Sequence, residues 1–246
     1  MKKAIVVGGS NGIGLAIATC LAKEYNVVVV DKSEPDASIA NRVTFEPLDL
    51  TSGDYSVFDR HQDASVVMIT AGFGRLALFE DIDEPLIDTY FKVNTLPVMH
   101  IVKRYYDKLL HEDGFRLGVM VSISGYMSSP FFSLYAATKA ALRMFIESVN
   151  VELEKSGSKN CILNVSPGSI KGTRFNGTTQ TDLDATRPLA EEIVGHLLAG
   201  DDLFIPLWDE VFCHVLERYH KDFRAEGRHS YDYKVASGRV AQKPAD

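Results

Sequence analysis

Cysteine and long apolar runs are both scarce in this sequence of 246 residues, and each scarcity excludes a class of protein. The three cysteines, Cys20, Cys161 and Cys213, are scattered without the spacing of metal ligands. We therefore expect buried, reduced thiols, with neither a metal site nor a disulfide framework. No apolar run approaches the roughly 18 residues that a membrane span needs. The sequence thus predicts a protein without a resident metal and without a membrane-embedded part.

Positively charged residues are fewer than negatively charged ones. The chain carries 26 lysines and arginines against 33 aspartates and glutamates, which gives a formal net charge of −7. A nucleic-acid-binding face needs clustered cations that neutralise phosphates, and this balance does not supply them. We therefore expect no nucleic acid among the partners of this chain.

We also expect no secretory leader. An apolar run, Ala4 to Val7, follows two lysines but ends at Gly8 and Gly9, and no cleavage site of small residues follows at the usual distance. A first β-strand explains this run better. Together with the sparse cysteines, this favours a cytoplasmic location.

Apolar runs alternate with stretches of helical periodicity along the chain, and this alternation predicts the fold class. We expect one α/β domain of the Rossmann type over residues 1–246, with a doubly wound, mostly parallel sheet and helices on both faces. The seven expected strands cover residues 3–8, 26–30, 43–48, 66–69, 117–123, 160–165 and 203–207. The expected helices cover residues 14–25, 85–111, 133–156 and 189–199.

Two further segments flank the last of these elements. Residues 168–187 are rich in Gly, Thr, Asn and Asp, which is typical of a loop, and we expect them to form a lid over the site. Residues 208–246 show apolar positions at helical spacing and are expected to form a C-terminal helical extension.

A glycine-rich turn joins the first expected strand to the first expected helix. Its spacing, Gly8-x-x-x-Gly12-x-Gly14, permits a tight turn and directs a helix N-terminus toward a pyrophosphate. Asp31 ends the second strand, where a carboxylate can accept both hydroxyls of an adenosine ribose. That carboxylate would repel a 2′-phosphate, so NAD is favoured, while the adjacent Lys32 leaves NADP possible. The phosphate-binding residues predicted in this turn are Gly8, Ser10, Asn11, Gly12, Ile13 and Gly14.

A serine, a tyrosine and a lysine occupy positions from which their side chains can meet. Ser122 closes an expected strand, and Tyr135 and Lys139 stand four residues apart on one face of the next expected helix. A free tyrosine ionises near pH ~10, and a cation within about 4–6 Å favours the phenolate. We therefore expect Lys139 to lower the pKa of Tyr135, so that its phenol serves as general acid and base. Ser122 would orient the oxygen of a carbonyl or hydroxyl substrate.

With these residues together, the chain resembles the compact branch of the short-chain dehydrogenase/reductase family, over about residues 3–207. Ser122 precedes Tyr135 by 13 residues, the interval usual in that family. The resemblance implies an active site of Asn94, Ser122, Tyr135 and Lys139, in which Asn94 supports a water relay from Lys139 to solvent. It also implies cofactor contacts from Asp49, Leu50, Ala71, Gly72, Tyr135, Lys139, Pro167, Gly168 and Ile170.

Two positions depart from the pattern of the family. Val7 stands where the family often has threonine, and Thr173 falls one residue late for the threonine that usually follows Pro167-Gly168. These departures concern details of cofactor binding and leave the four implied active-site residues intact.

The resemblance implies an NAD(P)-dependent oxidoreductase that interconverts a secondary alcohol and a ketone or aldehyde by hydride transfer. It also implies a homodimer or homotetramer, in which the helices near residues 86–111 and 134–156 pair across a two-fold axis. One alternative is a non-catalytic NAD(P)-binding regulator, which the intact active-site residues argue against. Another is an extended-branch sugar-nucleotide epimerase or dehydratase, which the glycine spacing and the modest length disfavour.

The substrate has no recognisable motif. Cations gather near the expected lid and in the C-terminal extension, and one hypothesis is that some of them bind an anionic group such as a sugar phosphate. The alternative is a solvated helix face that packs on the body or on a neighbouring subunit. These cations are Arg75, Lys171, Arg174, Arg218, His220, Lys221, Arg224, Arg228, His229 and Lys234.

Overall fold

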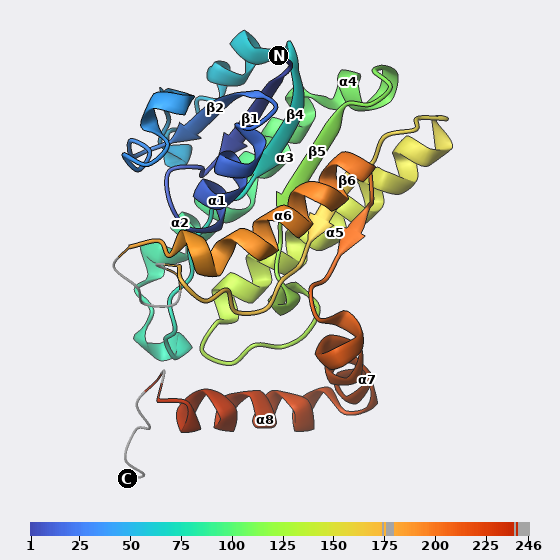
Figure 1. The fold of residues 1–246 in the computed structure, drawn as a ribbon. Coiled ribbons are helices and arrows are strands. Elements are labelled where there is room, and N and C mark those ends of the chain that lie inside the picture. The colour runs from blue at the N-terminus through green and yellow to red at the C-terminus, as the bar shows by residue number, and fades with distance from the viewer. Residues whose placement is uncertain (174, 176–179, 239, 241–246) are drawn as a thin grey trace.

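A parallel sheet of seven strands forms the centre of the molecule (Figure 1). The computed structural model describes residues 1–173, 175, 180–238 and 240. The strand order is β3-β2-β1-β4-β5-β6-β7, and every neighbouring pair is parallel, which confirms the predicted fold class. The strands are β1 (Lys3–Val7), β2 (Asn26–Asp31), β3 (Val43–Pro47), β4 (Ala64–Ile69), β5 (Arg116–Met120), β6 (Ile162–Val165) and β7 (Leu203–Phe204).

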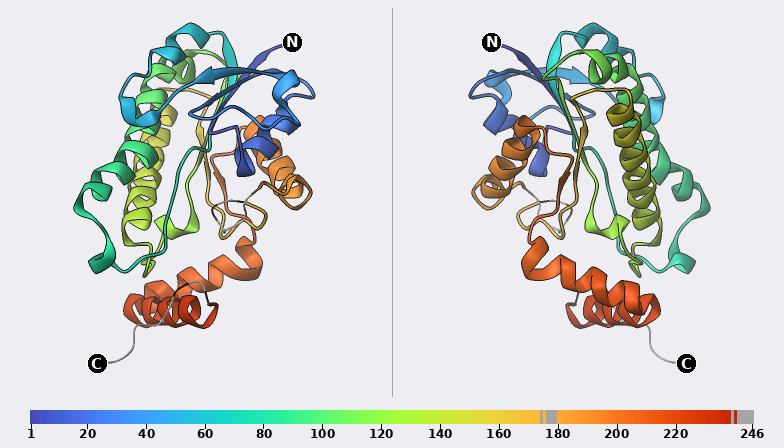
Figure 2. Two further views of the ribbon diagram at one scale, coloured as in Figure 1. Left: turned by 90° about the vertical axis from the view of Figure 1, so that its left-hand side faces the viewer. Right: turned by 90° about the vertical axis from the view of Figure 1, so that its right-hand side faces the viewer.

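Helices cover both faces of the sheet, α1 and α6 on one side and α2 to α5 on the other (Figure 2). Successive side chains of β1 therefore enter two separate cores: Ala4 and Val6 join the cluster under α1 and α6, and Ile5 and Val7 join the other. Because both faces are buried, the strands are apolar almost throughout. The helices are α1 (Gly12–Leu21), α2 (Glu84–Asn94), α3 (Leu96–Arg104), α4 (Tyr106–His111), α5 (Ser133–Lys155), α6 (Leu183–Ala199), α7 (Cys213–Lys221) and α8 (Phe223–Ala236).

The strand order reverses direction beside β1, and this reversal positions the site. From β1 the chain proceeds outward to β2 and β3, and it then returns to the other side of β1 as β4. The loops that leave the carboxyl ends of β1 and β4 diverge at this point, and open α/β sheets bind ligands in the crevice so formed. The segments that follow β1, β2, β4, β5 and β6 share this edge of the sheet.

The helix expected over residues 85–111 is divided into three helices, so this prediction was wrong. α2 ends at Asn94, and the backbone leaves helical geometry at Thr95, with φ −123° and ψ −61°. Pro97 explains this first break, because proline lacks an N–H and its ring conflicts with the carbonyl four residues earlier. A second break at Tyr105 separates α3 from α4.

The expected lid over residues 168–187 is also too long, because α6 begins within it at Leu183. The carboxylate of Asp182 caps this helix, accepting hydrogen bonds from the backbone N–H groups of Asp184 (3.1 Å) and Ala185 (3.0 Å). Pro188 lies inside α6 and had favoured a later start. Residues 174 and 176–179 of the expected lid lie outside the described residues.

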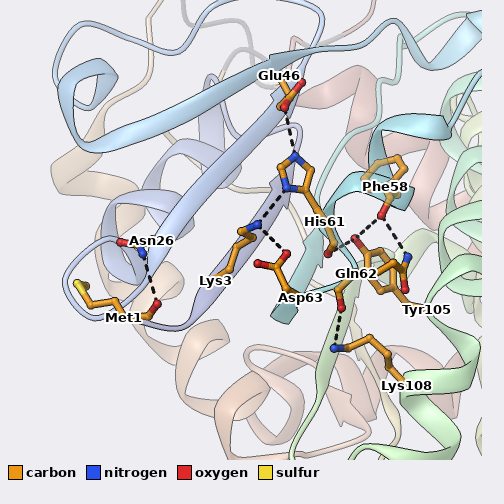
Figure 3. A network of polar contacts seen from close by, with 10 residues as sticks. All are labelled: Met1, Lys3, Asn26, Glu46, Phe58, His61, Gln62, Asp63, Tyr105 and Lys108. Carbon is orange, nitrogen blue, oxygen red and sulfur yellow. Dashed lines mark hydrogen bonds and ion pairs between the residues drawn. The ribbon is translucent and has the colours of Figure 1, made fainter.

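A polar network near the start of β1 ties β1 to the segments that precede α3 (Figure 3). Lys3 donates a hydrogen bond to Asp63 at 2.6 Å, and its Nζ lies 3.4 Å from Nδ1 of His61. The other ring nitrogen of His61 lies 3.2 Å from Oε1 of Glu46, and Tyr105 donates to the His61 carbonyl at 3.2 Å. None of these five residues belongs to the predicted site, so this network stabilises the sheet and takes no part in the site.

α7 and α8 lie beyond the carboxyl ends of the strands, on the side of the predicted site (Figures 1 and 2). Leu216 of α7 is buried with Ile123 and Ile205 in a small apolar cluster. This contact fixes α7 on the body. Among the helices that the structure describes, none has the length and apolar character that crossing a membrane requires.

Candidate active site

The glycine-rich turn after β1 has the geometry that its sequence predicts. Gly8 and Gly12 have φ values of +82° and +58°, a region that residues with a side chain rarely adopt. A Cβ on Gly8 would lie 2.6 Å from the backbone nitrogen of Ala71, so the two predicted cofactor segments are in direct backbone contact. A Cβ on Gly14 would overlap the Gly8 carbonyl and the Thr70 hydroxyl. The turn is therefore packed too closely at Gly8 and Gly14 for either residue to carry a side chain.

Asp31 lies at the end of β2, beside this turn. Its carboxylate accepts hydrogen bonds from the backbone N–H groups of Ser10 (3.1 Å) and Ser33 (3.4 Å). A cavity of about 250 Å³ opens next to these residues, lined by Ser10, Asn11, Leu15, Ser33, Glu34 and Thr181 among others. This cavity is large enough for part of a nucleotide and has a carboxylate at its edge.

One contact in this turn had no signal in the sequence. The backbone N–H of Gly12 donates to the hydroxyl of Thr181 at 2.6 Å, although 169 residues separate them. Thr181 immediately precedes the Asp182 that caps α6, so the start of this helix places its hydroxyl over the turn.

The remaining predicted cofactor residues follow the carboxyl ends of β3, β4 and β6. Asp49 accepts hydrogen bonds from the backbone N–H and hydroxyl of Thr51, which hold the pKa of its carboxyl below the usual range. The Pro167 carbonyl accepts from the backbone N–H of Ile123 at 3.1 Å, which joins the loop after β6 to the loop after β5. The others of this group, placed along the same edge, are Leu50, Ala71, Gly72, Gly168 and Ile170.

Ser122, Tyr135 and Lys139 converge on this edge. Ser122 follows β5, where its hydroxyl accepts from the N–H of Ser124 (3.1 Å) and lies 3.5 Å from the Pro167 carbonyl. α5 carries the other two residues, and Nζ of Lys139 lies 5.6 Å from the centre of the Tyr135 ring. Ser122 also forms a hydrogen bond with the Tyr135 phenol.

The electrostatics of this group differ from the expectation. Burial raises the pKa of Tyr135 to about 12, although the hydrogen bond from Ser122 opposes the shift. Lys139 is fully enclosed and donates to the Met120 carbonyl at 2.7 Å, and burial lowers its pKa to about 7. The predicted lowering of the phenol pKa by Lys139 is therefore not found, because burial disfavours the phenolate and Lys139 is not among the groups that shift this pKa.

Asn94 lies at the end of α2 and is completely buried. Its side-chain oxygen accepts from the N–H of Phe73 at 2.9 Å, and its amide nitrogen donates to the Phe73 carbonyl (2.9 Å) and to the Thr138 hydroxyl (3.2 Å). The amide thus fastens the loop after β4 to α5. A Cβ on Gly72 would lie 3.3 Å from this Asn94 oxygen and 3.5 Å from Nζ of Lys139, so only a glycine leaves the space between them open.

Several aromatic residues of the site were missed by the sequence reasoning. Phe132 and Phe175 contact the Tyr135 ring, and Tyr90 lies close enough to influence its pKa. Tyr90 also accepts a hydrogen bond from the N–H of Arg75 at 2.9 Å. Phe132 lies between Ser122 and Tyr135 in the sequence, and nothing in the periodicity distinguished these three aromatic residues from ordinary core residues.

Comparison with known proteins agrees with this geometry. A family model described as short chain dehydrogenase matches residues 2–184. An uncharacterised oxidoreductase of Staphylococcus epidermidis is 26% identical over 189 residues, covering 72% of this chain and 81% of that protein. An uncharacterised oxidoreductase of Escherichia coli is 26% identical over 200 residues, covering 76% of this chain and 73% of that protein.

Solved structures share the fold. A short-chain dehydrogenase from Burkholderia cenocepacia, in complex with NADP, superposes with a TM-score of 0.75 at 18% identity, covering 94% of this chain and 99% of that one. A short-chain dehydrogenase from Streptomyces avermitilis superposes with a TM-score of 0.73 at 22% identity, covering 98% of this chain and 100% of that one. An alcohol dehydrogenase from Thermococcus sibiricus, complexed with 5-hydroxy-NADP, superposes with a TM-score of 0.67 at 22% identity, covering 83% of this chain and 95% of that one.

Proposed function

Since the chain belongs to the short-chain dehydrogenase family of oxidoreductases, we propose that it interconverts a secondary alcohol and a ketone or aldehyde with NAD(H) as the cofactor. The observation that carries this proposal is the convergence of Ser122, Tyr135 and Lys139 beside the bare glycine turn. A proton donor, an orienting hydroxyl and a cation thus stand next to a backbone cradle suited to a pyrophosphate.

The residues present fit a nicotinamide dinucleotide. The absence of side chains at Gly8, Gly12 and Gly14 lets the backbone approach a pyrophosphate, although the N–H groups of Gly8 and Gly12 are bonded to the Val30 carbonyl and the Thr181 hydroxyl. The cavity beside Asp31 suits an adenosine ribose. On the other side of the crevice, only the backbone of Gly72 lies against the buried ammonium of Lys139, the group that would bind the hydroxyls of the second ribose. When bound, the cofactor supplies or accepts the hydride.

The residues of this chain would handle the proton. In the direction of reduction, the Tyr135 hydroxyl donates its proton to the oxygen of the carbonyl as that oxygen gains negative charge. Ser122, whose hydroxyl already bonds this phenol, donates a second hydrogen bond to the same oxygen and fixes its position. Lys139, with its Nζ 5.6 Å from the centre of the Tyr135 ring, would supply a positive charge beside the phenolate left behind.

A purely regulatory cofactor-binding role is the rival proposal. Such a protein would bind NADH without turnover, and it would not need the Ser122–Tyr135 contact. A screen of hydroxy and carbonyl compounds, followed by NADH absorbance alongside NADH binding by fluorescence, separates the two. Binding without turnover of any compound would favour the regulator.

The choice of cofactor is expected to depend on Asp31. Its carboxylate, held by two backbone N–H groups, would repel a 2′-phosphate and accept the two hydroxyls of the NAD ribose. In Asp31→Ala, we expect the ratio of kcat/KM for NADH to that for NADPH to fall at least about tenfold. The measurement is initial rates with each cofactor, and Asp88→Ala on the exposed face of α2 is the control. An unaltered ratio in Asp31→Ala would remove this residue from cofactor selection.

We also propose that the chain forms a dimer or tetramer through α3 and α5. The proposal is supported by exposed apolar residues on these helices, since Leu96, Met144 and Val151 are 43%, 58% and 56% exposed in the single chain. Sedimentation equilibrium should then give a multiple of the 27.2 kDa chain mass. Met144→Glu with Val151→Glu should shift the protein toward a monomer, and a monomeric wild-type protein would refute the proposal.

A further inference from the structure

Aromatic rings pack around the candidate proton donor. The ring centres of Phe132 and Phe175 lie 5.3 and 5.2 Å from that of Tyr135. The two phenylalanine rings stack on each other at 5.9 Å, with an angle of 19° between their planes. On the same side, a Cβ on Gly74 would come within 2.8 Å of Phe175 and 3.0 Å of Tyr135, so the backbone also lies flat against these rings.

Phe132 is held in place by α8, which lies outside the part of the chain that the family model matches. Lys234 of α8 is only 8% exposed, and its ammonium donates to the Pro130 carbonyl (2.9 Å) and the Ser129 hydroxyl (3.1 Å). The same ammonium lies 5.9 Å from the centre of the Phe132 ring. A buried lysine is costly unless its donors are used, and here they are used on the loop that carries Phe132.

A second contact from α8 supports the same loop. The ring of Tyr231 packs on that of Phe131 at 4.6 Å, and the backbone carbonyl of Phe131 accepts from the N–H of Ala77 at 2.9 Å. Phe131 has a φ of +65°, which is unusual for a residue with a side chain and persists only where the surroundings enforce it. The loop before α5 is thus in a strained conformation that α8 and the segment at Ala77 hold.

Two cations of the C-terminal helices, Arg218 and Lys234, are engaged within the protein. Arg218 forms two hydrogen bonds with the buried Glu226, at 2.9 and 3.1 Å. Lys234 is bound to the loop before α5, and Arg224 lies against Phe223 on an exposed face. Arg174 lies outside the described residues. Lys234 and Arg218 therefore have partners inside the protein, and the rings described around Tyr135 are apolar.

We propose, on the basis of the reductase function above, that the substrate carries a flat apolar ring which packs on Phe132, and that Lys234 is the positioning residue that sets this surface. Phe175 already stacks on Phe132, so the substrate ring would take the place of Phe175 against that ring. Aromatic pairs are favoured beyond their burial by an amount that corresponds to a factor of about two to ten in affinity. The C-terminal helix thereby takes part in substrate recognition without touching the reacting atoms.

The test compares three carbonyl compounds that differ in the group beside the carbonyl. Acetophenone presents a flat ring, cyclohexyl methyl ketone a ring of similar size that is not flat, and dihydroxyacetone phosphate an anion. With NADH and the intact chain, we expect kcat/KM for acetophenone to exceed that for cyclohexyl methyl ketone about two- to tenfold. It should exceed that for dihydroxyacetone phosphate by more.

Two variants then test the two residues. In Phe132→Leu, KM for acetophenone should rise about three- to tenfold while KM for cyclohexyl methyl ketone changes less than about twofold. In Lys234→Met, which keeps the length of the side chain, the same selective rise should appear with kcat and the NADH dissociation constant nearly unchanged. The matched controls are Phe223→Leu and Lys221→Met, both at exposed positions of α7 and α8.

The outcomes separate this inference from the proposed function. Preference for dihydroxyacetone phosphate, or a rise of KM that is equal for all three compounds in Lys234→Met, would overturn the inference and leave the reductase function standing. Binding of NADH without turnover of acetophenone would also overturn it. Failure to bind NADH and to turn over any carbonyl compound would instead remove the proposed function. If Lys234→Met does not fold, as judged by circular dichroism, the Phe132→Leu comparison decides alone.

Discussion

Tyr135→Phe is expected to lower kcat by at least about 10³-fold while NADH still binds with nearly the wild-type dissociation constant. The change removes one oxygen atom, the only group that the mechanism uses to deliver a proton to the substrate. The ring and its contacts with Phe132 and Lys139 remain, so the crevice should keep its shape. Turnover is measured by NADH absorbance and binding by the fluorescence of the reduced nicotinamide.

Tyr106→Phe is the control for this experiment. It removes the same oxygen from a tyrosine of α4 that lies near Lys103 and away from the site. Its kcat should stay within about twofold of the wild type. Turnover by Tyr135→Phe above a few per cent of the wild-type rate would show that another group delivers the proton.

Lys139→Met is expected to stabilise the cofactor-free protein while abolishing turnover. Burial lowers the pKa of Lys139 from 10.5 to about 7, so below pH 7 the folded protein encloses a charged ammonium. Between about pH 7 and 10.5 the unfolded chain binds this proton and the folded chain does not, so wild-type stability rises with pH across that window. Replacement by methionine removes a penalty of several kcal/mol at pH 6.5, and this penalty fades as the pH approaches 10.5.

The measurement is the melting temperature of the two proteins at pH 6.5 and pH 9.5, without cofactor. The variant should melt higher by about 5–10 °C at the lower pH, and the difference should shrink at the higher one. The lost hydrogen bond to the Met120 carbonyl opposes this stabilisation, and more so at pH 6.5, where the donor is an ammonium, but it is smaller than the penalty of burying the charge. Lys221→Met, at an exposed position, should show no such pH dependence. A difference that is constant with pH would mean that Lys139 keeps its proton when buried.

The sheet and the glycine turn were predictable because their signals are local. Strands covered on both faces are apolar throughout, as Val27 to Val30 are, and Gly8 and Gly12 have the positive φ values that their spacing suggests. The helix break at Thr95 was missed. A proline is tolerated in the first turn of a helix, and the sequence alone does not show that Pro97 begins a new helix rather than lying inside a longer one. The early start of α6 was missed for the same reason at Pro188.

The pKa shifts of the site and the residues around the expected substrate position were not predictable, because they depend on burial and on contacts between residues far apart in the sequence. The four-residue spacing of Tyr135 and Lys139 predicts their proximity, yet the direction of the phenol pKa depends on how much protein surrounds it. Lys234 lies 104 residues from Pro130, and periodicity placed it among solvated cations. No local feature of the sequence indicates that the Lys234 ammonium is buried.

The hydroxyl of Thr181, 2.6 Å from the Gly12 nitrogen, has a consequence for how tightly a dinucleotide can be held. A phosphate oxygen that uses this amide has to exchange with an internal partner, not with water. The affinity gained there is the difference between two hydrogen bonds of similar kind, so the remaining contacts of the cofactor must supply most of its binding free energy.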